Sequence, residues 1–211
     1  MKVVVIGGTG TIGRAVADAL AARHQVVRVA RSEGDFTADL EDAASLVALF
    51  NAVAPFDAVV CCAGRASFKP LDQLAEPDFH VGLNSKLMGQ VNVVRLGMKQ
   101  VSDGGSFTLT SGVLAWEPTP GGAAISPVNA AVEAFARAAA LELPRGVRVN
   151  VVSPPWVSET LQAMGQNPSH GMPADQVARA YVQAVEGTQN GATIDARTLA
   201  GGEAASAPGA R

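Results

Sequence analysis

Residues 2–31 read KVVVIGGTGTIGRAVADALAARHQVVRVAR. A continuous apolar run at residues 3–6 ends abruptly in the glycine-rich segment 7–13. An amphipathic helical pattern follows over residues 12–20, and a second β-branched run covers residues 26–29. This order predicts a strand, a glycine turn, a helix and a second strand, which together make a βαβ unit with its fingerprint at the first turn.

The glycine spacing predicts a site for a dinucleotide pyrophosphate. Gly7 suits the backbone angles of a tight turn, Gly10 lets the backbone approach a pyrophosphate, and Gly13 lets the helix pack closely on the sheet. The helix expected to begin near Thr11 directs unpaired N–H groups and the positive end of its dipole toward the phosphates. The hydroxyls of Thr9 and Thr11 add two further donors.

Composition limits the classes of function. The 211 residues suit one α/β domain, and 48% hydrophobic residues with 17% charged residues supply a large core. A net charge of -3 without a block of like charges argues against nucleic-acid binding. Because no apolar run reaches membrane-spanning length and residues 1–6 already read as a strand, we expect neither a membrane segment nor a signal peptide.

The cysteines and histidines offer neither a disulfide nor a metal site. Cys61 and Cys62 are neighbours in an expected buried strand, and neighbouring side chains of a strand point to opposite faces. We therefore expect free thiols and a cytoplasmic location. The histidines, His24, His80 and His170, lack the spacing of metal ligands.

The rest of the chain alternates between strand and helix patterns. Further strands are expected over a short segment that ends at Asp39-Leu40 and over residues 57–62, 106–110, 147–152 and 192–196. Further helices are expected over residues 42–53, 77–99, 126–142 and 174–186, with a turn at 103–105 and a loop from 156 to 173. Near-continuous apolar strands indicate a parallel sheet covered on both faces. A single domain is expected over residues 1–198, and the tail 199–211 lacks an apolar pattern and is expected to be disordered.

Five later segments carry motifs that can be compared with known families. They are Asp39-Leu40, Cys61-Cys62-Ala63-Gly64, Thr110-Ser111, Asn129-Ala130-Ala131-Val132-Glu133 and Arg148-Val149-Asn150-Val151-Val152-Ser153-Pro154. With the glycine loop, they make the chain resemble the short-chain dehydrogenase/reductase family over nearly its whole length. The resemblance implies a Rossmann-type, doubly wound parallel sheet of order 3-2-1-4-5-6-7.

The resemblance also assigns roles to individual residues. It implies that Asp39 and Leu40 contact the adenine, and that Cys62-Ala63-Gly64 replaces part of the family's Asn-Asn-Ala-Gly segment at the cofactor. Ser111 takes the place of the catalytic serine, where its hydroxyl can hydrogen-bond a substrate carbonyl; the alternative is a serine that caps a turn.

Two positions depart from the family pattern. The family's catalytic Tyr and Lys stand four residues apart at the start of a helix, where this chain has Ile125 and Asn129. Isoleucine has no proton to donate, and asparagine carries no charge to lower the pKa of a tyrosine. The chain's one tyrosine, Tyr181, belongs to a late expected helix, so the usual acid is absent.

A lysine offers a replacement for that acid. Gly89 resembles the glycine that lies three residues after the family's active-site Asn, which places Lys86 at the Asn position. Asn84 is the alternative, from a gapless alignment. A partly desolvated ammonium has a lowered pKa and can act as an acid near neutral pH. The competing interpretation is that Lys86 is a solvated helix residue.

The end of the second strand indicates the cofactor. Arg31 and Ser32 suit the 2′-phosphate of NADP(H), whereas Glu33, one residue further, would favour NAD. After the sixth strand, we expect Pro154, the Val157 backbone and the Thr160 hydroxyl (or that of Ser158) to contact the cofactor. Ile12 completes this set, and Trp156 and Met164 are expected as apolar walls of an open cleft.

Three hypotheses for function follow. The first is an NADPH-dependent reductase of a small carbonyl or imine substrate with a rebuilt acid. The second is an inactive NADP(H)-binding sensor or scaffold, and the third is a non-redox enzyme such as an isomerase or lyase on the same fold. We also expect a homodimer or homotetramer, formed through the helices near 77–99 and 126–142, because small residues on the second helix permit close approach.

Overall fold

The computed structural model describes residues 1–199. Seven strands form one parallel sheet of order β3-β2-β1-β4-β5-β6-β7, which confirms the predicted fold class and strand order. The strands are β1 (Lys2–Ile6), β2 (Gln25–Ala30), β3 (Phe36–Thr37), β4 (Phe56–Cys61), β5 (Val101–Thr110), β6 (Arg148–Ser153) and β7 (Thr193–Asp195). The helices are α1 (Thr11–Ala21), α2 (Ala43–Val53), α3 (Glu76–Gly82), α4 (Gly89–Gly97), α5 (Ile125–Ala139), α6 (Ser158–Ala163) and α7 (Ala174–Glu186), and a π-helical turn spans Leu83–Met88.

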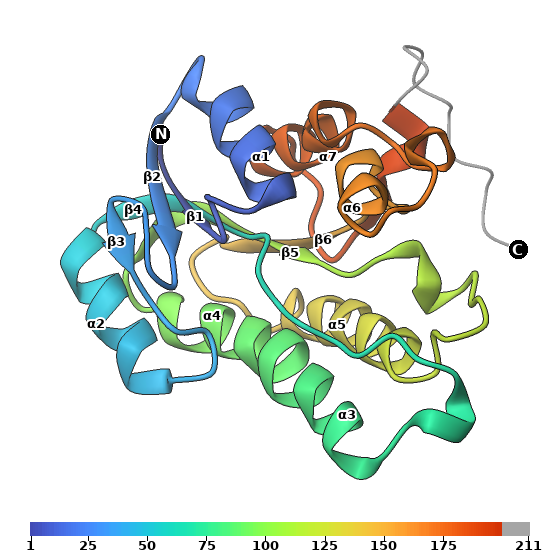
Figure 1. Cartoon of the computed structure of the whole chain (residues 1–211). Coiled ribbons are helices and arrows are strands. Elements are labelled where there is room, and N and C mark those ends of the chain that lie inside the picture. Colours follow the sequence, from blue (N-terminus) through green and yellow to red (C-terminus); the bar gives the residue numbers. More distant parts are fainter. Residues whose placement is uncertain (200–211) are drawn as a thin grey trace, which may run out of the picture.

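The sheet lies between two layers of helices (Figure 1). Helices α1, α6 and α7 lie on one side of it, and α2, α3, α4 and α5 lie on the other. The alternation of β1 shows why both layers form: Val4 and Ile6 belong to the core under α2, α4 and α5, whereas Val3 and Val5 belong to the core under α1 and α7. The apolar strands therefore have two faces to bury, as a parallel sheet requires.

Several element boundaries differ from the sequence predictions. The helix expected over 77–99 is interrupted by the π turn, where the Gly89 N–H bonds to the Asn84 carbonyl five residues back. Strand β3 ends at Thr37, so Asp39-Leu40 follows the strand instead of ending it. Strand β5 includes the turn expected at 103–105, and α6 occupies part of the expected loop.

A hydrogen-bond clamp explains the early start of β5. The Gly104 N–H donates to the Arg145 carbonyl, and the Arg145 guanidinium donates to the Val101 carbonyl at 2.9 Å. These contacts fix the strand's first residues beside the loop that precedes β6. Gly104 keeps a φ of +72°, and the pairing with β4 passes from Val101 directly to Ser106, so the expected turn is present as a bulge within the strand.

The structure describes only the first residue of the segment 199–211, which was predicted to be a disordered tail. Leu199, the first residue of the expected tail, ends a 3₁₀ turn over Ala196–Leu199. The remainder of that tail, 200–211, lies outside the described residues. Within residues 1–199, the structure contains no helix with the length and apolar character needed to cross a bilayer.

Candidate active site

Two cavities lie along the carboxyl ends of the strands, which is where ligands bind in parallel sheets. The first, the glycine-loop cavity, measures about 290 Å³ and extends from Gly7 and Gly10 to Arg31 and Arg65. The second, the serine cavity, measures about 250 Å³ and includes Ser111. Cys62, Ala63 and Gly64 border both cavities, so the two adjoin at the end of β4.

The glycine loop has the shape that a pyrophosphate needs. Gly7 adopts a φ of +83°, and a Cβ on Gly13 would collide with the Gly7 carbonyl oxygen. A Cβ on Gly10 would meet only that same oxygen, at 3.4 Å, so the outer side of Gly10 is open. Gly10 also precedes α1 without a side-chain cap, which leaves N–H groups of the first turn available to an anion. Thr9 lines the glycine-loop cavity, whereas Thr11 does not and lines a separate hollow beside α1.

At the far end of this cavity, arginines and carboxylates form a small network. An Arg31 Nη lies 3.3 Å from Asp39 and 3.6 Å from Glu41, and an Arg65 Nη lies 2.6 Å from Glu41. The Glu41 backbone N–H, and then Arg31, lower the pKa of Asp39. Leu40 and Ala38 supply an apolar surface in the same cavity, whereas Ser32 is exposed and lines neither cavity.

Lys86 points into the serine cavity from the π turn. Its Nζ donates to the Ser111 carbonyl at 2.8 Å. Burial lowers the pKa of Lys86 to about 8, although the nearby Cys61 thiol acts in the opposite direction. Its stem packs against Gly64, which has a φ of +141° and where a Cβ would lie 2.9 Å from the Lys86 Cγ. The alternative residue, Asn84, is exposed and lines neither cavity.

A buried glutamine, Gln90, connects the segments that carry Lys86 and Ser111. This residue was not predicted from the sequence. The Gln90 Nε2 donates to the Lys86 carbonyl at 3.0 Å and to the Thr110 carbonyl at 2.9 Å. The Gln90 Oε1 accepts the Thr110 N–H at 2.7 Å. The amide thus joins the π turn to the end of β5, directly before Ser111, and all of these groups are buried or partly buried.

The Ser111 hydroxyl bonds to Glu133, a residue that the sequence analysis named only as part of a family motif. Its Oγ donates to the Glu133 Oε1 at 2.8 Å, and Ser111 and Glu133 are only 2% and 8% exposed. Glu133 lies one and two helical turns beyond Asn129 and Ile125 on α5, so helical spacing could have placed it on the cavity side. Lys86 contacts the backbone of Ser111 and Glu133 contacts its side chain.

The positions that lack the family's Tyr and Lys also line the serine cavity. Ile125 begins α5, and Asn129, which is 1% exposed, lies one turn later. The Asn129 Nδ2 faces the Gly112 carbonyl at 3.4 Å, while its Oδ1 is buried without a hydrogen-bond partner among the described residues. Tyr181 is fully buried under the sheet, where its hydroxyl lies 2.7 Å from the Thr110 hydroxyl, and it lines neither cavity.

The remaining residues expected to contact the cofactor, and the two expected as apolar walls, do not all line the same cavity. Most of them line the serine cavity: Ile12, Cys62, Ala63, Pro154, Trp156, Val157 and Thr160. Met164 is half-exposed on the surface and does not line this cavity. Burial raises the pKa of Cys61 to about 12 and raises the pKa of Cys62 as well, so neither thiol is a ready nucleophile.

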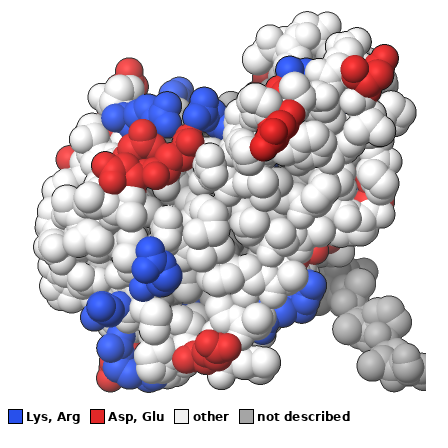
Figure 2. Space-filling model, turned by 90° about the horizontal axis from the view of Figure 1, so that it is seen from below, with Lys and Arg blue, Asp and Glu red and all other residues white. Residues whose placement is uncertain are grey.

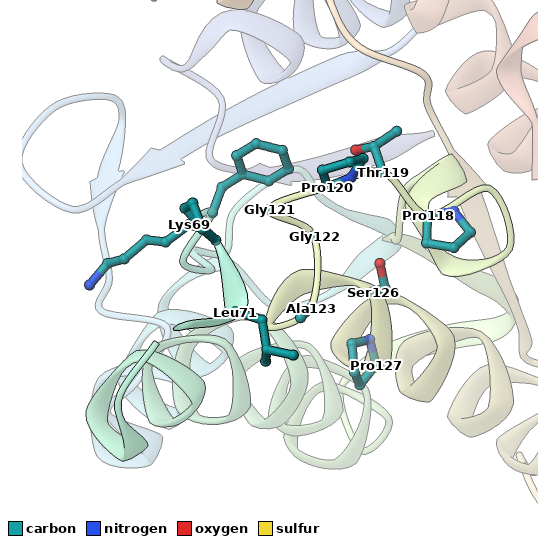
Figure 3. A pocket seen from close by; sticks show the side chains of 12 residues that line it. Lys69, Leu71, Pro118, Thr119, Pro120, Gly121, Gly122, Ala123, Ser126 and Pro127 are labelled. Atoms are coloured by element: carbon teal, nitrogen blue, oxygen red, sulfur yellow. The ribbon is translucent and has the colours of Figure 1, made fainter. Parts of the chain in front are cut away.

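A larger hollow lies beside the serine cavity (Figure 3). It measures about 700 Å³ and lies between Leu71, the 118–123 loop and the start of α5 at Ser126 and Pro127. Phe68, which lines this hollow, packs edge-on against Trp156 of the serine cavity with ring centroids 5.4 Å apart. Only the serine cavity brings Lys86, Ser111 and Asn129 together, so we place the chemistry there despite its smaller volume.

Comparison with known proteins assigns the family. A family model described as enoyl-(acyl carrier protein) reductase matches residues 4–196. The chain is also 31% identical to the short-chain dehydrogenase/reductase ucsE of Acremonium sp in an alignment 190 residues long that covers 72% of this chain and 70% of that protein. The chain belongs to the short-chain dehydrogenase/reductase family. The matched family model is described as a reductase and the relative as a dehydrogenase/reductase, which supports an oxidoreductase.

Two solved structures of similar proteins support the family assignment. The protein lin1944 from Listeria innocua is 38% identical, with a TM-score of 0.88 over 92% of this chain and 98% of that chain. A small-chain dehydrogenase in complex with NADPH is 27% identical, with a TM-score of 0.81 over 92% of this chain and 95% of that chain.

Proposed function

We propose that this short-chain dehydrogenase/reductase uses NADPH to reduce a small C=O or C=N group, with Lys86 in place of the usual proton donor. One observation carries the proposal: the Lys86 ammonium lies in the serine cavity, 2.8 Å from the Ser111 carbonyl. A lysine on a solvated helix face would not be held in this way. Burial lowers its pKa to about 8, which is suited to proton donation near neutral pH.

The glycine-loop cavity supports a dinucleotide cofactor. Its open side at Gly10, the uncapped start of α1 and the arginines at its far end fit a pyrophosphate and a 2′-phosphate. When bound, NADPH supplies the hydride. We assign the 2′-phosphate to Arg31, which would exchange its long contacts with Asp39 and Glu41 for the phosphate.

Lys86 and Asn129 have distinct roles in this proposal. Lys86 gives a proton to the substrate atom that becomes basic during reduction, and its charge stabilises that atom before transfer. The unpartnered Asn129 Oδ1 accepts a hydrogen bond from a ligand hydroxyl or amine. The serine cavity measures about 250 Å³ and also contains Val157 and Thr160, which are expected to contact the cofactor, so the space left for a substrate favours a small one.

The test measures NADPH oxidation with a panel of small aldehydes, ketones and cyclic imines, alongside a fluorescence titration of NADPH binding. We expect turnover with at least one substrate class and weaker activity with NADH. Tight NADPH binding without turnover of any class would favour a second candidate, an NADP(H)-binding protein without catalysis. Ile125 and Asn129, which provide neither an acid nor a cation, are the observation in favour of that candidate.

We also propose that the protein acts as a homo-oligomer in a reducing compartment, the cytoplasm. The helices α2 to α5 present a broad area without charged side chains, and Lys, Arg, Asp and Glu form small groups around it (Figure 2). Ala130, Ala134 and Ala138 are exposed on α5 and permit close helix contact. The free thiols of Cys61 and Cys62 are consistent with a reducing environment.

A further inference from the structure

The direction of one hydrogen bond determines what Ser111 can offer a ligand. A hydroxyl has a single proton, and a carboxylate can only accept hydrogen bonds. Because the Ser111 Oγ lies 2.8 Å from the Glu133 Oε1, its proton points toward Glu133. Toward the serine cavity, the Ser111 Oγ therefore presents lone pairs, and it can accept a hydrogen bond but not donate one.

This part of the cavity is lined by acceptors, and the Glu133 carboxylate lies directly behind Ser111. The described residues place no Lys, Arg or His within 4 Å of the Glu133 carboxylate, although Glu133 is 8% exposed. A second acceptor, the Asn129 Oδ1, lacks a partner, and its orientation is set by the Nδ2 that faces the Gly112 carbonyl. Among the residues that the structure describes, Lys86 is the one cationic donor that lines the cavity.

This polarity suits one of the two substrate classes better than the other. A carbonyl oxygen becomes more negative as it is reduced, so it needs several donors and is disfavoured by a nearby carboxylate. An imine nitrogen is much more basic than a carbonyl oxygen, and once protonated it carries positive charge and an N–H that needs an acceptor. Lys86 can supply that proton, the Ser111 Oγ can accept the N–H, and Glu133 can balance the charge.

We propose that Glu133, acting through Ser111, makes this protein an imine reductase that discriminates against ketones of similar size. The inference rests on the proposed NADPH-dependent function and narrows its substrate class. In the reaction, the imine nitrogen takes a proton from Lys86, the imine carbon gains a hydride from NADPH, and the π electron pair of C=N moves onto nitrogen. The products are an amine, NADP⁺ and a neutral lysine, which regains its proton from water.

Glu133 is a positioning residue in this scheme, because it contacts Ser111 and does not line the cavity itself. Replacement by glutamine retains its shape but removes its charge. The new amide can also donate to the Ser111 Oγ, which frees the serine proton for a substrate oxygen. The variant should therefore lose its preference for imines without losing its fold.

The experiment compares NADPH oxidation with 2-methyl-1-pyrroline and with 2-methylcyclopentanone, in the full-length protein and in Glu133→Gln. We expect kcat/KM for the imine to exceed that for the ketone by at least about tenfold, and the ratio to fall by about ten- to a hundredfold in the variant, the usual range for a charge-assisted hydrogen bond. Glu142→Gln, which removes an exposed carboxylate just beyond α5, is the matched control and should retain the ratio.

Two results would overturn the inference while leaving the proposed function intact: equal reduction of both substrates, or an unchanged ratio in Glu133→Gln. If Glu133→Gln does not fold, Ser111→Ala tests the inference instead. This variant removes the oxygen that accepts the N–H and should reduce the same ratio. An unchanged ratio in that variant contradicts the inference equally.

A lack of turnover with both substrates would overturn the proposed function instead. The inference is then decided by calorimetric binding of 2-methylpyrrolidine and 2-methylcyclopentanol to the complex with NADP⁺. A preference for the amine that disappears in Glu133→Gln supports an acceptor-lined, cation-selective cavity. Equal binding of the two ligands rejects it.

Discussion

The two cavities at the strand ends are built in different ways. In the glycine-loop cavity, the decisive features belong to the backbone: the φ of Gly7, the open side of Gly10 and the uncapped N–H groups of α1. In the serine cavity, they belong to side chains, those of Lys86, Ser111, Asn129 and Glu133. A backbone site depends on glycine spacing and tolerates few changes, whereas a side-chain site can be rebuilt one residue at a time. In the proposed function, the family's cofactor-binding end is retained, and its reacting end carries different side chains.

The largest effect is expected in the serine cavity. Lys86→Met retains most of the apolar stem and removes the ammonium, so we expect kcat to fall by roughly two to four powers of ten, the usual contribution of general acid catalysis. NADPH affinity, measured by fluorescence titration, should not change. Lys99→Met, at an exposed site after α4, is the matched control. An unaffected kcat would show that Lys86 is not the acid.

The second-largest effect is expected for cofactor binding in the glycine-loop cavity. Arg31→Ala should weaken NADPH binding by roughly ten- to a hundredfold, because a charged hydrogen bond contributes about 1.5–3 kcal/mol. NADH, which lacks the 2′-phosphate, should bind nearly as before. Arg95→Ala on α4, where the exposed Arg95 guanidinium donates to the Asn92 side chain, serves as the control. Equal weakening of both cofactors would assign Arg31 a structural role.

The pH profile tests whether the two cavities titrate independently. Lys86 has a pKa of about 8 in the folded protein, below its ordinary 10.5. Its acidic form is present below that pH and is lost above it, so kcat for reduction should fall about tenfold per pH unit once the pH exceeds about 8. The dissociation constant of NADPH should show no inflection there. Lys86→Arg, whose side chain stays charged, should remove the inflection in kcat; its persistence in that variant would assign it to another group.

The smallest expected effect on catalysis comes from the outer face of α5. This helix carries Asn129 and Glu133 on its buried side and Ala134 on its exposed side. Ala134→Arg should convert an oligomer to a monomer in light scattering at micromolar concentration, with little change in kcat. Ala22→Arg, at an exposed position after α1 in the other helix layer, is the control. A wild-type protein that is already monomeric would reject the proposed assembly.

The comparison also explains what the sequence could predict. The parallel sheet and the glycine loop were predictable because strand patterns and glycine spacing are local signals with a fixed structural meaning, whereas the strand order came from the family resemblance. The proximity of Lys86 to Ser111 could be expected only through the family resemblance, because the two residues are 25 positions apart in the sequence. The hydrogen bond between Glu133 and Ser111 depends on the exact rotation of α5. The hydrogen bonds of Gln90 depend on that of the π turn. Helical spacing can place Glu133 on the same side of α5 as Asn129, but no single-sequence pattern specifies the rotations that bring these groups into contact.

The π turn at Leu83–Met88 has a consequence for how this site can change by insertion or deletion. A π turn accommodates one residue more than an α turn, and one residue corresponds to about 100° of helical rotation. Gly82 before the turn packs on Val128, and Gly89 after it packs on Leu40, so both flanking helices are locked in their own phase. Loss of one residue between these glycines would restore a regular helix, and Lys86 would rotate out of the cavity while both anchors stayed in place. The length of this short segment, more than its composition, thus sets the direction of the reactive amine.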